Sequence, residues 1–244
     1  MLNKPKKFLG QHFLKNKKIL EEMARAAELS KNDVVWEVGP GTGTLTEVLV
    51  LRAKKVIAVE KDRELIPLLQ EKFGGRKNIK IIYGDILKFD MAALKLKNYK
   101  IVANIPYYIT SRFLRLFLSE TKFRPKLMVL MVQKEVAERI CAKPPRMNLL
   151  ALSVQAYAEP EIIRRVSKNF FSPPPKVDSA IIKITLGHSV SKSEQILALA
   201  KLAFQQKRKM LRRSLKQFKI PQKYQNKRPE ELSLKDWADL LQNA

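Results

Sequence analysis

Short apolar segments alternate with helix-like segments along most of this chain, and no other sequence feature restricts the fold as strongly. The segments that read as buried strands are Val34–Val38, Val56–Val59, Ile79–Tyr83, Ile101–Ala103 and Leu127–Val132. Apolar residues at helical spacing occupy the stretches Leu45–Leu51, Glu64–Phe73 and Arg112–Ser119. Continuously apolar strands are typical of parallel sheets whose connecting helices cover both faces. The alternation therefore predicts an α/β domain built on a parallel sheet.

The later part of the chain continues this pattern and then changes to helices alone. A helix, two strands, a linker and two helices are predicted, in this order: Glu135–Ile140, Leu150–Tyr157, Asp178–Leu186, Gly187–Ser193, Glu194–Phe218 and Leu232–Leu241. The linker is inferred from its serines and its glycine. We expect a large domain of residues 1–186, which includes a basic N-terminal arm, and a small helical domain of residues 187–244.

A glycine-rich turn, Glu37-Val38-Gly39-Pro40-Gly41-Thr42-Gly43, follows the first predicted strand. Glycines there let a cofactor approach the backbone, and the next helix presents free N–H groups. Acids follow the next two strands: Glu60 can accept both hydroxyls of a ribose, and Asp85 can accept an adenine amino group. Parallel strands end at one edge of the sheet, so the turn and both acids are expected to line one crevice.

The Gly-x-Gly-x-Gly spacing of Gly39, Gly41 and Gly43 departs from the Gly-x-Gly-x-x-Gly fingerprint of dinucleotide sites. Together with the two acids, it resembles the S-adenosylmethionine site of Rossmann-like methyltransferases, whose sulfonium cofactor needs no phosphate cradle. An NAD-dependent enzyme is the alternative, but the sequence offers no evident acid or base for hydride transfer. We expect S-adenosylmethionine as the cofactor.

The tetrapeptide Asn104-Ile105-Pro106-Tyr107 directly follows a strand-like segment. An Asn side chain offers a carbonyl acceptor to an exocyclic amino group, and Pro fixes the backbone angle of the turn. Tyr offers a face on which a flipped base can stack. An X-Pro turn that merely ends a strand is the alternative. Behind three strand ends that line a cofactor crevice, the tetrapeptide is predicted to be the place where methyl donor and base meet.

The composition favours a nucleic-acid partner. Lys and Arg number 48 against 23 Asp and Glu, which gives a formal net charge of +25. Such self-repulsion is usually explained by a polyanionic partner. The apolar strands are too short to cross a membrane, and the N-terminus lacks the apolar stretch of a signal peptide, so we expect a cytoplasmic protein. The single Cys141 excludes an internal disulfide and a multi-cysteine metal site, and no metal is expected.

Several motifs in order resemble the small-subunit ribosomal RNA adenine N6,N6-dimethyltransferases of the KsgA type. They are Gly10–Leu14, Glu37–Gly43, Asn104–Tyr107 and Asn169–Ala180. The run Pro-Pro-Pro-Lys-Val-Asp-Ser-Ala inside the last motif is the most specific, and the glycine turn is the least specific. The resemblance covers nearly the whole chain.

The resemblance implies transfer of two methyl groups to N6 of each of two adjacent adenosines in the 3′-terminal hairpin of the small-subunit RNA, with a role in small-subunit biogenesis. It implies a clamp for the flipped base made of Tyr107 and Phe171, with Asn104 accepting from the amino group. The implied cofactor contacts are His12, Leu14, Gly39, Gly41, Glu60, Asp85 and Asn104. The implied RNA contacts, in the basic segment Lys207–Lys216, are Lys207, Arg208, Arg212 and Arg213. The expected partner is the small ribosomal subunit, and a monomer is expected.

Other functions stay open at this point. Methylation of large-subunit RNA would use the same chemistry, and the full Pro-Pro-Pro-Lys-Val-Asp-Ser-Ala run speaks against it. A DNA amino-methyltransferase usually has a second proline where Ile105 stands. A non-catalytic RNA-binding assembly factor is the alternative from another class. The complete set of Glu37, Glu60, Asp85, Asn104 and Tyr107 speaks against loss of catalysis.

Overall fold

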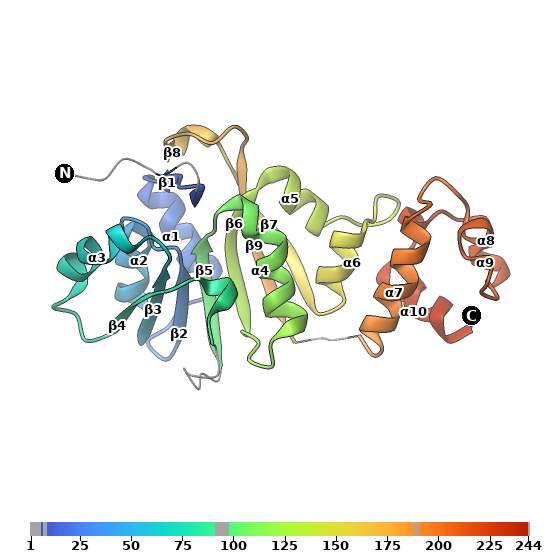
Figure 1. Cartoon of the computed structure of the whole chain (residues 1–244), viewed down its shortest axis with the longest axis horizontal. Helices are drawn as coiled ribbons and strands as arrows, with labels where there is room; N and C mark the ends of the chain where they lie inside the picture. Colours follow the sequence, from blue (N-terminus) through green and yellow to red (C-terminus); the bar gives the residue numbers. More distant parts are fainter. Residues whose placement is uncertain (1–5, 7–8, 91–97, 188–189, 244) are drawn as a thin grey trace. The chain divides into compact units, whose positions relative to one another are not determined.

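The computed structural model describes residues 6, 9–90, 98–187 and 190–243, which divide into two compact units (Figure 1). The first unit comprises Met1–Ala137 and Glu161–Leu186, and the second comprises Glu138–Pro160 and Gly187–Ala244. This division differs from the one expected at residue 186, because residues 138–160 group with the C-terminal helices. The expected linker, Gly187–Ser193, lies partly outside the described residues.

The strands are β1 Phe13–Leu14, β2 Val34–Val38, β3 Lys55–Glu60, β4 Ile79–Tyr83, β5 Tyr99–Asn104, β6 Leu127–Gln133, β7 Ala158–Val166, β8 Phe171–Ser172 and β9 Ser179–Leu186. The α-helices are α1 Lys17–Ala26, α2 Thr44–Arg52, α3 Ile66–Phe73, α4 Thr110–Arg115, α5 Lys134–Ile140, α6 Leu149–Gln155, α7 Ser193–Phe204, α8 Leu211–Ser214, α9 Gln222–Gln225 and α10 Leu234–Asn243. Single turns of other helix types that bear on the site are η2 Arg63–Leu65, η3 Ile86–Lys88 and η5 Tyr107–Ile109.

A seven-stranded sheet with the order β4-β3-β2-β5-β6-β9-β7 forms the centre of the fold. The strands from β4 to β6 pair in parallel, as the sequence predicts, whereas β9 pairs antiparallel to β6. The chain runs outward from β2 through β3 to β4, and then returns to add β5 on the other side of β2. Ligands of open α/β sheets bind at such a reversal of strand order.

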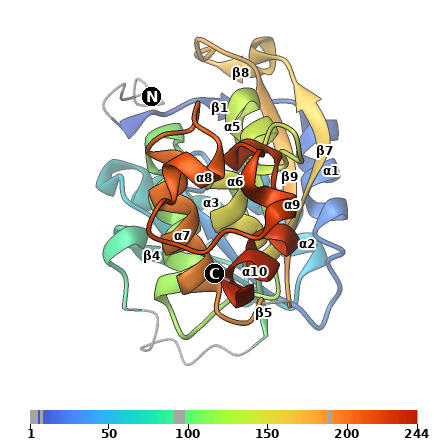
Figure 2. The same ribbon diagram turned by 90° about the vertical axis from the view of Figure 1, so that its right-hand side faces the viewer.

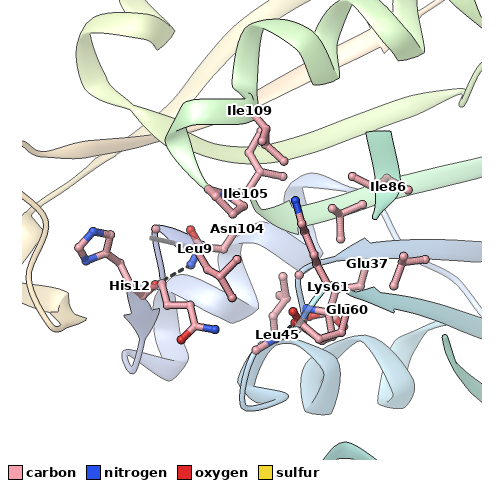
Figure 3. A pocket seen from close by; sticks show the side chains of 18 of the residues that line it. Leu9, His12, Glu37, Leu45, Glu60, Lys61, Ile86, Asn104, Ile105 and Ile109 are labelled. Carbon is pink, nitrogen blue, oxygen red and sulfur yellow. Dashed lines mark hydrogen bonds between the residues drawn. The ribbon is translucent and has the colours of Figure 1, made fainter. Parts of the chain in front are cut away.

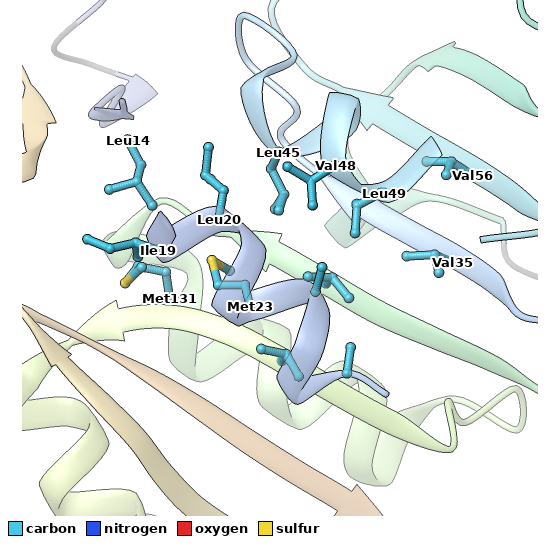
Figure 4. Packing of buried hydrophobic residues seen from close by; sticks show 14 of the residues in the cluster. Leu14, Ile19, Leu20, Met23, Val35, Leu45, Val48, Leu49, Val56 and Met131 are labelled. Carbon is cyan, nitrogen blue, oxygen red and sulfur yellow. The ribbon is translucent and has the colours of Figure 1, made fainter. Parts of the chain in front are cut away.

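Helix α1 and helix α2 cover one face of the sheet (Figure 4). Asn16 caps α1 by accepting a hydrogen bond from the backbone N–H of Ile19 at 3.2 Å. The buried face of the helix carries Ile19, Leu20 and Met23, and Ile19 lies beside Met131 of β6, whereas Val35 and Val56 lie beside Leu49 of α2. Complete burial of such a side chain contributes roughly 1.5–3 kcal/mol, so this layer stabilises the packing of α1 and α2 on the sheet.

An aromatic layer covers the opposite face of the sheet. The indole of Trp36 in β2 contacts the rings of Phe89, Tyr99 and Phe117 at centroid distances of 5.8, 5.3 and 6.3 Å. Val35 and Trp36 point to opposite faces because side chains alternate along a strand. Both faces are therefore buried, as the continuous apolar strands predict.

The expected strand Leu150–Tyr157 is wrong. Residues Leu149–Gln155 form helix α6, and the strand that follows, β7, begins at Ala158. Asn148 caps the helix, since its side chain accepts from the N–H of Ala151 at 3.0 Å. An Asn before a run of good helix formers is a helix-start signal, and that signal outweighs the apolar content that suggested a strand.

The second unit is a helical cluster that includes α6 (Figure 2). Its core gathers Ala151 and Leu152 from α6 with Leu199 of α7, Leu211 of α8 and Trp237 of α10. The predicted continuous helix Glu194–Phe218 is interrupted between Phe204 and Leu211. The chain turns between these two residues and buries Leu211. The basic segment Lys207–Lys216 therefore occupies a loop and the short helix α8. No helix among the described residues is long and apolar enough to cross a membrane.

Candidate active site

The carboxyl ends of four parallel strands meet at one pocket in the first unit (Figure 3). The pocket lies where the strand order reverses between β2 and β5. Segments of the N-terminal arm, the glycine turn and the strand ends line it: Leu9–Leu14, Glu37–Gly41, Val59–Lys61, Gly84–Ile86 and Asn104–Ile109. The structure thus brings together every sequence-predicted site residue of the first unit except Phe171.

Glu60 organises the glycine turn. Its Oε2 accepts from the N–H of Gly41 at 3.0 Å, and its Oε1 accepts from the N–H of Asp62 at 2.7 Å. Burial raises the pKa of Glu60, although these two hydrogen bonds oppose the shift. Each carboxylate oxygen keeps a further lone pair, so Glu60 can also accept a ligand hydroxyl.

The structure requires glycine at positions 41 and 39 for different reasons. Both have positive φ, +60° and +66°. A Cβ on Gly41 would lie 2.8 Å from Cε1 of Phe13 in the arm, whereas a Cβ on Gly39 would meet nothing within 4 Å. Gly41 therefore allows close packing of the arm, and Gly39 leaves open space at the wall of the pocket.

Glu37 is a buried acid at the base of the pocket, 1% exposed, and its Oε2 has no hydrogen-bond partner. Burial, with the nearby Glu60 carboxylate adding to it, raises the pKa of Glu37 to about 8. In the unfolded chain a Glu titrates near 4.3. Between about pH 4.3 and 8 the folded protein therefore keeps a proton that the unfolded chain releases, and its stability falls as pH rises through this window.

Replacing Glu37 by glutamine is expected to remove this pH dependence. The variant gains on the order of a few kcal/mol of unfolding free energy over the parent at pH 8, and the gain disappears near pH 4.5. Urea denaturation at a series of pH values measures the difference. Glu71→Gln, at an exposed position of α3, is the control and is expected to show no such trend. A gain for Glu37→Gln that is independent of pH would contradict the assignment.

Asp85 follows β4 and is already engaged by the protein. Its Oδ1 accepts from the N–H of Leu87 at 3.0 Å, and its Oδ2 lies 3.0 Å from Nζ of Lys61. Burial acts to raise the pKa of Asp85, but the contacts with Lys61 and Leu87 outweigh it and lower the pKa. The sequence did not mark Lys61, because a lysine after a strand-end acid is an ordinary surface residue.

The N-terminal arm is fastened over the pocket by Asp62. Nζ of Lys6 and Nε2 of Gln11 each lie 2.8 Å from one oxygen of this carboxylate. Burial acts to raise the pKa of Asp62, and the contacts with Lys6 and Gln11 more than offset it. The backbone of Asp62 also binds Glu60, so the arm and the glycine turn share one hydrogen-bond network. The sequence does not reveal that Asp62 holds the arm, because residues 6 and 62 lie far apart in the chain and meet only in the folded structure.

The far end of the pocket holds Asn104 and Tyr107. Nδ2 of Asn104 donates to the backbone oxygen of His12 at 3.1 Å, which orients the amide and leaves its Oδ1 as an acceptor. The hydroxyl of Tyr107 lies 2.6 Å from Oγ of Ser179. Burial raises the pKa of Tyr107, so the phenol stays neutral. An amide acceptor and an aromatic ring therefore stand together at the end of β5.

Phe171 and the four basic residues predicted to contact RNA do not line the pocket. Phe171 is 4% exposed, pairs with Leu14 through β1 and β8, and belongs to the apolar core instead of the pocket lining. Leu14 belongs to the core and also borders the pocket. In the second unit the predicted RNA contacts are all exposed: Lys207, Arg208, Arg212 and Arg213. The described residues contain no cluster of three or more potential metal ligands.

A doubly wound sheet with a glycine turn and strand-end acids around one pocket defines this chain as a Rossmann-like methyltransferase. The family model for ribosomal RNA adenine dimethylase matches residues 2–242. The chain belongs to that family.

Relatives of known name or structure agree with this membership. The ribosomal RNA small subunit methyltransferase A of Dehalococcoides mccartyi is 48% identical over 221 residues, covering 88% of this chain and 75% of the relative. A dimethyladenosine transferase from Plasmodium falciparum has a TM-score of 0.81 at 28% identity, covering 94% and 96% of the two chains. The 23S rRNA methyltransferase ErmE also has a TM-score of 0.81, at 26% identity, covering 95% and 98%.

Proposed function

We propose that this protein uses S-adenosylmethionine to dimethylate N6 of two adjacent adenosines in the 3′-terminal hairpin of small-subunit ribosomal RNA. Family membership carries the proposal, since the matching model describes a ribosomal RNA adenine dimethylase. The small-subunit target is supported by the name of a relative that is 48% identical. A chain with a net charge of +25 is also suited to a polyanionic substrate.

The residues of the pocket fit this cofactor. The open space beside Gly39 is where a ligand can approach the backbone. The buried Oε2 of Glu37 has no partner and suits a hydrogen-bond-donating ligand group. We infer that Gly39, Gly41, Glu60 and Asp85 hold the cofactor, with Leu14 as an apolar wall. When bound, S-adenosylmethionine supplies an electrophilic methyl group.

Adenine N6 is a weak nucleophile because its lone pair is delocalised into the ring. Two groups of this chain can counteract that delocalisation. Oδ1 of Asn104 accepts one hydrogen of the amino group, and the backbone oxygen of Ile105 accepts the other. These two acceptors favour a pyramidal nitrogen with its lone pair directed at the methyl donor. The new bond would make a hydrogen on N6 strongly acidic, and that proton would leave to water, so catalysis consists mainly of positioning and no strong base is required.

The decisive experiment supplies the full-length protein with methyl-labelled S-adenosylmethionine and small ribosomal subunits that lack the modification. The expected product is N6,N6-dimethyladenosine in the recovered small-subunit RNA. Large subunits in a parallel reaction test the resemblance to ErmE, and no product is expected there. Product in large subunits alone would replace the proposed substrate, and product in neither would refute the proposed activity.

Neutralising two arginines of the second unit is expected to weaken RNA binding. Each phosphate contact contributes about one unit to the slope of log affinity against log salt, so Arg212→Gln with Arg213→Gln should flatten the slope by about 2. The measurement is a salt titration of binding to small-subunit RNA. Lys201→Gln with Lys235→Gln, which are exposed in the same unit, is the control. An unchanged slope in the arginine variant would place the RNA contact elsewhere.

A further inference from the structure

Asp62 binds the N-terminal arm although it does not line the pocket itself. The residue is 5% exposed, and the pocket is lined by its partners Gln11 and Glu60 instead. Oδ1 of Asp62 lies 2.8 Å from Nζ of Lys6 and accepts from the N–H of Glu64 at 3.1 Å, while Oδ2 accepts from Nε2 of Gln11 at 2.8 Å. Hydrogen bonds to a charged group are about twice as strong as neutral ones. Asp62 therefore acts on the pocket through other residues, and strongly.

On the arm, Lys6 and Gln11 are bound to each other as well as to Asp62. The backbone N–H of Lys6 donates to Oε1 of Gln11 at 2.8 Å. Because the oxygen of this amide is taken up in that way, its nitrogen is the atom that donates to Asp62. The three residues close one ring of hydrogen bonds, and this ring holds the first part of the segment Leu9–Leu14, which lines the pocket.

The other end of the same segment is held by contacts that do not involve Asp62. The backbone oxygen of His12 accepts from Nδ2 of Asn104 at 3.1 Å, and β1, which follows directly, pairs with β8. Loss of the Asp62 contacts would therefore release residues 9–11 and leave the part of the arm next to Asn104 in place.

The backbone of Asp62 faces the acid expected to hold the ribose of the cofactor. Its N–H donates to Oε1 of Glu60 at 2.7 Å, and Oε2 of Glu60 accepts from the N–H of Gly41. Between the two acids, Lys61 lies 3.0 Å from Oδ2 of Asp85. Three successive residues at the end of β3 thus bind the glycine turn, the turn after β4 and the arm, which form three walls of the pocket.

We propose that Asp62 is a positioning residue that couples fastening of the arm to binding of the cofactor. This rests on the proposed function, which assigns the pocket to S-adenosylmethionine. A ligand bound to Glu60 favours the arrangement in which Glu60 also holds the backbone of Asp62, and this arrangement directs the Asp62 carboxylate at the arm. Coupling between two binding events is reciprocal, so the fastened arm in turn retains the ligand.

The test begins with Asp62→Asn in the full-length protein. In either orientation of the new amide its nitrogen meets a donor, and the charge that pairs with Lys6 is lost. Affinity for S-adenosylhomocysteine, measured by calorimetry, is expected to fall about tenfold. The KM for S-adenosylmethionine should rise by a similar factor, whereas kcat at saturating cofactor should stay within about threefold of the parent. A fall in kcat with an unchanged KM would overturn the proposal.

A reciprocal exchange separates positioning from a general loss of stability. Asp62→Asn combined with Gln11→Glu swaps the carboxylate and the amide, so the amide at position 62 can donate to the carboxylate at position 11 and the net charge is kept. This double variant is expected to recover affinity to within about threefold of the parent. Gln11→Glu alone places two carboxylates against each other and should lose affinity at least as strongly as Asp62→Asn. Absence of recovery in the double variant would contradict the proposed contact.

Hydrogen exchange tests the fastening of the arm without any ligand. The N–H of Leu9 donates to the backbone oxygen of Lys6 at 3.1 Å, so its exchange reports whether this part of the arm is held. Mass spectrometry of the ligand-free protein should show faster exchange in residues 9–11 of Asp62→Asn than of the parent, with no change in α1. S-adenosylhomocysteine should slow exchange of these residues in the parent. Equal exchange in parent and variant would overturn the role of Asp62.

Glu64→Gln is the matched control, because Oε1 of Glu64 also lies close to Nζ of Lys6, at 2.9 Å. The side chain of Glu64 is 55% exposed, and exposed ion pairs contribute little. Its affinity for S-adenosylhomocysteine should stay within about twofold of the parent. A loss as large as that of Asp62→Asn would assign the effect to the charge around Lys6 and overturn the proposal.

The parent protein distinguishes this inference from the proposed function. A parent that binds no S-adenosylhomocysteine would refute the assigned cofactor, and the coupling with it, before any variant is compared. A parent that binds the ligand but forms no dimethyladenosine would refute the proposed reaction alone, since calorimetry still measures the coupling. Equal affinity in the parent and in Asp62→Asn would refute the coupling alone.

Discussion

Asn104→Ala is expected to reduce methyl transfer at least about 100-fold, the range seen when one transition-state hydrogen-bond partner is removed. The amide of Asn104 is oriented by its bond to His12, so its Oδ1 is a fixed acceptor at the end of β5. Affinity for S-adenosylhomocysteine should fall far less than transfer does. Single-turnover methylation of unmodified small subunits measures the first quantity, and calorimetry measures the second.

Glu60→Ala is the matched comparison, because it removes an acid from the same pocket with a different predicted role. Glu60 binds the N–H groups of Gly41 and Asp62, so its loss releases the glycine turn and the fastening of the arm. Cofactor affinity should fall at least about tenfold in this variant. Equal losses of cofactor affinity in Asn104→Ala and Glu60→Ala would contradict the separate roles assigned to the two residues.

Gly39→Ala is expected to lower transfer at least about 100-fold with only a moderate loss of stability. The φ of +66° costs an alanine about 1 kcal/mol in the folded state. Its Cβ meets no protein atom within 4 Å and would instead occupy the space where the cofactor approaches the backbone. Misplacement of a reacting group by about 1 Å is enough to cost about 100-fold in rate.

Gly75→Ala provides the control for Gly39→Ala. A Cβ at Gly75 also meets nothing within 4 Å, and its φ is outside the left-handed region. This variant should keep parental transfer and parental cofactor affinity. The hypothesis about Gly39 would be refuted if Gly39→Ala kept parental affinity for S-adenosylhomocysteine in calorimetry, whatever its melting temperature.

The sequence predicted the parallel part of the sheet and the meeting of strand-end residues correctly. Strands that are apolar on both faces can only be buried between helices, and parallel strands necessarily end at one edge. Gly39, Glu60, Asp85 and Asn104 therefore fell into one pocket. The antiparallel β9 was not predicted as such, because an apolar strand has the same composition in either orientation.

Helix α6 had a local signal that the apolar content of the segment obscured, whereas two other features depend on contacts that no local pattern encodes. The Asn148 cap identifies α6, but the apolar run Leu149–Leu152 is equally compatible with a buried strand. The fastening of the arm joins Lys6 to Asp62, and neither residue type is unusual in its place. Burial of Phe171 against Leu14 depends on the pairing of two-residue strands, which are too short to leave a periodic signal.

The second unit is interrupted in the sequence, and this arrangement constrains how the protein can be shortened. A chain that ends at Leu186 would keep α6 while removing the helices that bury Ala151 and Leu152. Such a truncation would display an apolar helix face to water and invite aggregation. During translation of this chain, residues 138–160 are also synthesised before β9. The first unit therefore completes its sheet only after part of the second unit has been made. The first unit therefore cannot complete its fold before synthesis of the second has begun, although each unit has its own hydrophobic core.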